Sequence, residues 1–186
     1  MNSTDFVLSL IDAFNGHVEG RSLLQRRAYF VSVLAGIDSE VGFVTHYNSP
    51  YSPIVDNAVT RLKSLGLLAQ LDIKPPLTSP GFDMKLYEYR LTNEGVKAAA
   101  AVKQSQDYGR IASACRAVLR ITNPGPLTLA IAAKAHFTLK QRGRETSSSD
   151  IVREAQKYNS TINQPTLDAA VRFLGEIELD TRSNPT

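Results

Sequence analysis

The sequence of 186 residues is poor in the side chains that most often carry chemistry. It has one cysteine, three histidines and no tryptophan. A single cysteine, Cys115, excludes an internal disulfide and fits a reducing compartment, so we expect a cytoplasmic protein. His17, His46 and His136 lie in three separate segments, which argues against convergent metal ligands. We therefore expect neither a metal nor any other cofactor.

The sequence also lacks an apolar run near the roughly 18 residues that a membrane span requires, and its N-terminus has no basic region or cleavage site typical of a secretory signal. No phosphate-binding, dinucleotide-binding, zinc-protease or serine-hydrolase motif is present. A Cys115 nucleophile paired with His136 is conceivable, but Cys115 falls on an apolar helix face, which favours a buried structural thiol. We expect a protein without enzymatic activity and without a membrane partner.

The clearest local signal is a short amphipathic helix that begins after Ser52. The Ser52-Pro53 pair is a helix start, because the hydroxyl caps the first turn and proline has no N–H to leave unpaired. Apolar residues then recur at helical spacing up to Leu65, and Gly66 stands at a C-terminal cap position. The helix is expected to be polar on its outer face and to run directly into a β-ribbon.

The surrounding pattern predicts a mainly α fold with a small β-hairpin wing, namely a winged helix-turn-helix followed by a helical C-terminal extension. The winged helix-turn-helix occupies residues 1–106, the extension residues 107–179, and a frayed tail residues 180–186. Helices are expected at 5–14, 20–35, 93–106, 108–121, 127–141, 151–158 and 166–177, and strands at 68–73 and 85–91. The proline-rich segment between the two strands is expected to form the tip of the wing.

Four segments resemble the YwgA-like winged-helix family of bacterial and archaeal proteins. They are GRSLLQRRAYFV at 20–31, HYNSPYSP at 46–53, LKSLGLL at 62–68 and YEYRLTNEG at 87–95. Asn48-Ser49-Pro50 departs from the glycine-proline pair that this family has at the tyrosine-rich turn. LTLAIAAKAHFTL at 127–139 and LDAAVRFLGEIEL at 167–179 also resemble the helical extension of this family. The resemblance therefore covers most of the chain and implies a winged-helix scaffold. It also implies a genomic setting near phage, toxin–antitoxin or defence genes.

In such a fold the outer face of the third helix approaches the DNA major groove. Asn and Arg are the residue types that read adenine and guanine edges in bidentate fashion. The candidate DNA-binding residues are Arg26, Arg27, Asn57, Thr60, Arg61, Lys63 and Ser64. Of these, Asn57, Thr60 and Arg61 are expected to face bases. Arg26, Arg27 and Lys63 are expected to hold phosphates. Asp56 and Asp72 would repel phosphate. The leading hypothesis is a DNA-binding regulator or accessory protein.

The basic charge, however, lies mostly outside this region. Residues 1–95 hold 8 Lys and Arg against 10 Asp and Glu, whereas residues 96–186 hold 13 against 8. Lys134, Lys140, Arg142 and Arg144 fall in a stretch without acids, and they form either a secondary basic surface or the cationic end of a helix. The split favours an alternative, in which the winged helix docks a protein partner as a scaffold or adaptor subunit. A homodimer is a further possibility.

Overall fold

The computed structural model describes residues 2–47, 49–73, 86–120, 125–143, 150, 153–154 and 164–183. The helices in these ranges are α1 (Ser3–Ala13), α2 (Gly20–Leu34), α3 (Asp38–Val41), α4 (Pro53–Ser64), α5 (Asn93–Val102), α6 (Gln106–Arg120), α7 (Pro126–Gln141) and α9 (Gln164–Ser183). The strands are β1 (His17–Glu19), β2 (Val44–His46), β3 (Ser49–Tyr51), β4 (Leu68–Ile73) and β5 (Leu86–Leu91). The predicted fold class, mainly α with a small β-hairpin wing, is confirmed.

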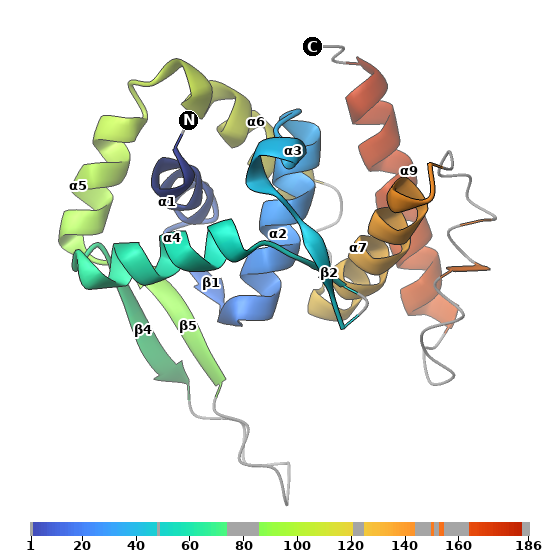
Figure 1. The fold of residues 1–186 in the computed structure, drawn as a ribbon, viewed down its shortest axis with the longest axis horizontal. Helices are drawn as coiled ribbons and strands as arrows, with labels where there is room; N and C mark the ends of the chain where they lie inside the picture. Colours follow the sequence, from blue (N-terminus) through green and yellow to red (C-terminus); the bar gives the residue numbers. More distant parts are fainter. Residues whose placement is uncertain are drawn as a thin grey trace, which may run out of the picture.

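The wing belongs to a three-stranded antiparallel sheet with the strand order β1-β5-β4. Leu68 lies opposite Leu91 in the hairpin, and Val18 lies opposite Tyr89 on the other side of β5. Because β1 stands between α1 and α2, this pairing fixes the wing to the start of α2. Figure 1 shows β4 and β5 projecting from the body near the C-terminal end of α4, far from α7 and α9.

Helix α4 begins and ends where the sequence predicts, for the local reasons given above. The Ser52 hydroxyl accepts a hydrogen bond from the Val55 N–H at 3.1 Å and donates one to the Val41 carbonyl at 2.6 Å. At the other end, Gly66 adopts φ +68°, and the Leu67 N–H reaches back to the Leu62 carbonyl at 2.9 Å. A left-handed residue at this position favours glycine. The cap at each end therefore fixes where the polar face of α4 starts and stops.

A second hairpin, β2–β3, occupies the link between α2 and α4. Val44 lies opposite Tyr51, and the hairpin packs against α2 and α7. Gln25 of α2 holds it in place, because its side-chain amide bonds both the N–H and the carbonyl of Ser52, at 2.9 and 3.0 Å. The hairpin and the start of α4 are thus positioned together.

One continuous hydrophobic core runs from α1 to α9. Helix α2 is at its centre and packs against α6, α7 and α9. The rings of Phe30 on α2 and Phe173 on α9 meet edge to face with centroids 4.9 Å apart. The predicted winged-helix segment (1–106) and the predicted extension (107–179) therefore share one apolar interior. Their division into two domains stays a prediction. Helix α9 continues to Ser183, where the sequence predicts a frayed tail from residue 180.

Candidate nucleic-acid interface

The outer face of α4 carries the predicted base-reading residues. Val55, Ala58, Val59 and Leu62 are buried against the core. The opposite face exposes Asn57, Thr60, Arg61 and Ser64. The helical period alone therefore predicted which side chains would be accessible.

The exposed side chains on α4 differ in whether they already form hydrogen bonds within the protein. The Thr60 hydroxyl donates to the Asp56 carbonyl at 3.1 Å, and the Ser64 hydroxyl donates to the Thr60 carbonyl at 3.0 Å. Such bonds turn short hydroxyls back onto their own helix. The side chains of Asn57 and Arg61, in contrast, form no hydrogen bond or ion pair with another described residue. These two side chains are the ones available to an external ligand.

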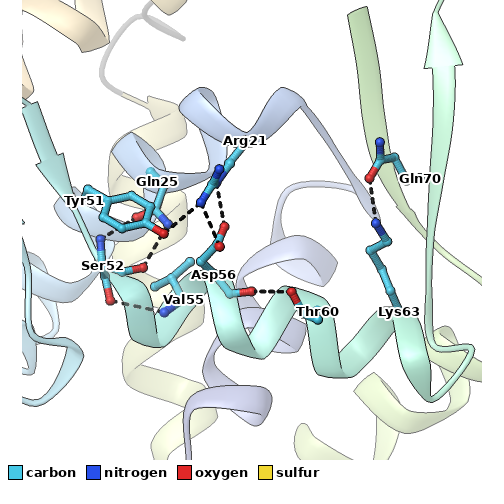
Figure 2. Close-up of polar contacts among 9 residues, drawn as sticks. All are labelled: Arg21, Gln25, Tyr51, Ser52, Val55, Asp56, Thr60, Lys63 and Gln70. Atoms are coloured by element: carbon cyan, nitrogen blue, oxygen red, sulfur yellow. Dashed lines mark hydrogen bonds and ion pairs between the residues drawn. The ribbon is translucent and has the colours of Figure 1, made fainter. Parts of the chain in front are cut away.

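Lys63 connects the helix to the wing. Its ammonium donates to Gln70 Oε1 on β4 at 2.7 Å, as Figure 2 shows. Lys74 and Lys85 lie outside the described residues, together with the wing tip. Lys63 is thus the cation that the structure places between α4 and the described part of the wing.

Arg21 at the start of α2 is the important residue near this face that the sequence did not reveal. Its guanidinium forms an ion pair with the Asp56 carboxylate at 2.6 Å and donates to the Tyr51 hydroxyl at 2.8 Å, and Figure 2 shows it between these two side chains. Burial lowers the pKa of Arg21, but the bonds to Tyr51 and Asp56 outweigh this, and the net shift is upward. The negative charge of Asp56, which would repel phosphate, is therefore neutralised.

Arg26 and Arg27 are not brought to α4. The Arg26 guanidinium donates to the Pro126 carbonyl at 3.3 Å, at the start of α7. Arg27 lies over the Phe14 ring at 4.3 Å, in the geometry of a cation–π contact. Burial lowers the pKa of both side chains. Their predicted phosphate contacts are not part of the α4 face.

Two of the four cations of the secondary basic surface form ion pairs with acids outside the segment. Lys140 forms an ion pair with Asp38 at 2.6 Å, and Arg142 forms one with Glu154 at 2.9 Å. Lys134 lines a cavity between α2, the β2–β3 hairpin and α7. Arg144 lies outside the described residues. The stretch without acids in the sequence is therefore no continuous basic surface over its described part.

The Cys115–His136 pair that sequence reasoning considered is not formed. His136 Nδ1 lies 2.6 Å from the hydroxyl of Tyr29, and both side chains are buried. Burial raises the pKa of the Cys115 thiol to about 12, so the reactive thiolate is disfavoured. The favoured interpretation, a buried structural cysteine, fits this arrangement. The absence of enzymatic activity stays a prediction.

No group of three or more His, Cys, Asp or Glu in the described ranges could hold a metal ion. Within the same ranges, no helix combines the length and the apolar character needed to cross a bilayer.

The fold and the exposed α4 face together define a mainly α protein with a β wing beside a polar helix. No protein-family model matches the sequence, and no curated protein is significantly similar to it. The resemblance to YwgA-like proteins therefore stays a prediction.

Proposed function

We propose that the protein is a non-enzymatic DNA-binding regulator or accessory protein whose α4 approaches the major groove. The observation that carries the proposal is the availability of Asn57 and Arg61, one helical turn apart on the exposed face of α4. An amide and a guanidinium at this spacing are suited to contact neighbouring base edges. The setting implied by the family resemblance is a defence or mobile-element locus.

The surroundings of α4 support this assignment. Lys63 stands between α4 and β4, where a phosphate would lie if the helix entered a groove with the wing beside it. Thr60 and Ser64 keep acceptor capacity after donating to the helix carbonyls. With Asp56 paired to Arg21, the face presents a net positive charge.

The test is a titration of labelled duplex DNA at two salt concentrations, with Arg61→Ala beside the wild type. A lost bidentate base contact costs about 1–3 kcal/mol. We therefore expect roughly 5- to 150-fold weaker binding to a selected duplex, and salt-dependent binding in the wild type. Fluorescence anisotropy with a sequence selected from a random pool gives both quantities.

The matched control is Arg116→Ala, which removes the same charge from the exposed side of α6. It should change the affinity little, since Arg116 is not on α4. Equal losses in the two variants would show that general charge, rather than the α4 face, controls binding. Full affinity in Arg61→Ala would remove the assignment.

A second candidate function is docking of a protein partner on the same side, as a scaffold or adaptor subunit. Apolar residues flank the polar face of α4: Ile54 is 40% exposed, and Leu65, just beyond the helix, is 58% exposed. Exposed apolar side chains of this kind are typical of protein interfaces when they are contiguous. Absence of DNA binding at low salt would favour this candidate, and sedimentation of the wild type beside Leu65→Asp would show whether the partner is a second copy.

A further inference from the structure

A cavity of about 440 Å³ lies between α2, the β2–β3 hairpin and α7. Its size falls in the range of small-molecule sites, roughly 300–1,000 Å³. The proposed DNA contacts on α4 do not use it. The cavity is lined by side chains from three segments, within residues 21–26, 46–51 and 127–134, and it has distinct cationic and aromatic parts.

The cationic part consists of Arg21, Arg26 and Lys134, of which Arg21 is already ion-paired with Asp56. Among the described residues that line the cavity, none carries a carboxylate. Arg26 is the most informative of the three, because its pKa is lowered by burial and no described carboxylate pairs with it. A half-buried guanidinium in this condition has lost part of its hydration without gaining a counter-charge. An anion in the cavity would supply that counter-charge.

The aromatic part comes from the hairpin. The ring of His46 meets Tyr47 edge on, with centroids 4.5 Å apart, and is tilted against Tyr51 at 5.0 Å. Tyr51 is also covered by the Arg21 guanidinium at 5.2 Å. The three rings and the cations therefore line the same cavity.

Tyr47 presents an exposed aromatic ring beside this cavity. It lies in the turn between β2 and β3, where two residues separate the paired His46 and Ser49. Its φ of +46° is in the left-handed region that such tight hairpin turns require, so the turn accounts for the backbone conformation. The residue is 88% exposed. The ring is therefore accessible to a base that stacks on it.

We propose that this cavity binds a phosphorylated nucleoside, with its phosphate at the cationic part and its base against the rings of His46 and Tyr47. Guanidinium groups bind phosphate oxygens in a bidentate manner. Stacking of a base on an aromatic side chain contributes about 1–3 kcal/mol and tolerates any base. The site goes beyond the proposed DNA contacts and does not depend on them. The phosphorylated nucleoside is either a free mononucleotide or the end of a single strand.

The experiment is calorimetric titration of the full chain with AMP, adenosine, inorganic phosphate, and a short single strand with and without a 5′-phosphate. We expect AMP to bind at least tenfold more tightly than adenosine or phosphate alone, because only AMP engages both parts of the cavity. Tight binding of the 5′-phosphorylated strand with weak binding of AMP would identify the strand end as the ligand.

Two variants test the two parts of the site separately. Arg26→Met should weaken AMP binding at least tenfold, and Arg26→Lys should restore part of it. Tyr47→Asn removes the ring but keeps a residue that tolerates the left-handed backbone, and it should weaken AMP at least fivefold while leaving phosphate binding unchanged. The matched control is Lys97→Met, which removes an exposed cation from α5.

The proposal is overturned if neither AMP nor the phosphorylated strand binds at millimolar concentration. It is equally overturned if Arg26→Met and Tyr47→Asn bind as the wild type does. Equal affinity for AMP and adenosine would contradict a phosphate site, and equal affinity for AMP and phosphate would contradict the base contact. Duplex binding by α4 is measured separately, so failure of one proposal leaves the other standing.

Discussion

The outer face of α4 and the basic segment at 134–144 differ in how folding changes the charge that each presents. In the sequence, the segment has four cations and no acid, whereas the α4 face includes Asp56. In the structure, Asp38 and Glu154 reach two of the segment's cations, while Arg21 neutralises Asp56. The charge that a ligand meets is therefore set by ion pairs between residues far apart in the sequence.

The polar groups of these two regions also have different roles, one in stability and the other in binding. The cations at the C-terminal end of α7 connect this helix to α3 and to Glu154, so they contribute to the fold. Asn57 and Arg61 contact no other described side chain through hydrogen bonds or ion pairs, and the fold gains little from them. We expect changes around α7 to alter stability, and changes on α4 to alter binding.

The largest expected effect lies on the buried side of α7. Burial lowers the pKa of His136 to about 4, against an ordinary value of 6.5. Between these values the unfolded chain binds more protons than the native protein, so stability is complete above about pH 6.5 and falls as the pH drops toward 4. The loss should be roughly 3 kcal/mol, from 1.36 kcal/mol per unit of pKa. Urea unfolding at pH 4.5, 5.5, 6.5 and 7.5 measures it.

The control for this prediction is His136→Gln, in which the excess slope of stability with pH should disappear. The interpretation fails if the wild type and His136→Gln have the same slope, whatever their stability at pH 7.5.

Local signals explain the part of the structure that the sequence could predict. The Ser52-Pro53 start and the Gly66 end of α4 act within one helical turn, and the helical period fixes its exposed face. Strand β1 was missed because three residues are too few for an alternating pattern. Its position depends on pairing with β5, about seventy residues later.

The candidate sites show the same division between local and distant interactions. The exposure of Asn57 and Arg61 follows from the period of one helix, so it was predictable. The ion pairs Arg21–Asp56 and Lys140–Asp38 join residues 35 and 102 positions apart. No pattern in a single sequence specifies such partners. The cavity was missed for the same reason, since its lining comes from three segments.

An intermediate effect is expected for the ion pair between Arg142 and Glu154. Glu154 is 3% exposed, and in Arg142→Met its carboxylate would lose a charged partner. Hydrogen bonds to charged groups contribute about 1.5–3 kcal/mol, so unfolding should become easier by roughly 1–3 kcal/mol. The matched variant Lys140→Met breaks a more exposed pair and should cost less than about 1 kcal/mol. Equal losses in urea unfolding would contradict the distinction.

The smallest effects should come from Arg21 and Asp56, and their signs test whether this pair sets the charge of the α4 face. The pair is half exposed on the Arg21 side, so breaking it should change stability by less than about 1 kcal/mol.

Asp56→Asn removes a negative charge beside the proposed phosphate path and should tighten duplex binding roughly two- to fivefold at low salt. Arg21→Met leaves Asp56 unpaired and should weaken binding by a similar factor. The double variant has the wild-type net charge and should bind nearly as the wild type does, because the two changes offset each other. Shifts of the same sign in both single variants would mean that the pair positions α4 rather than setting its charge.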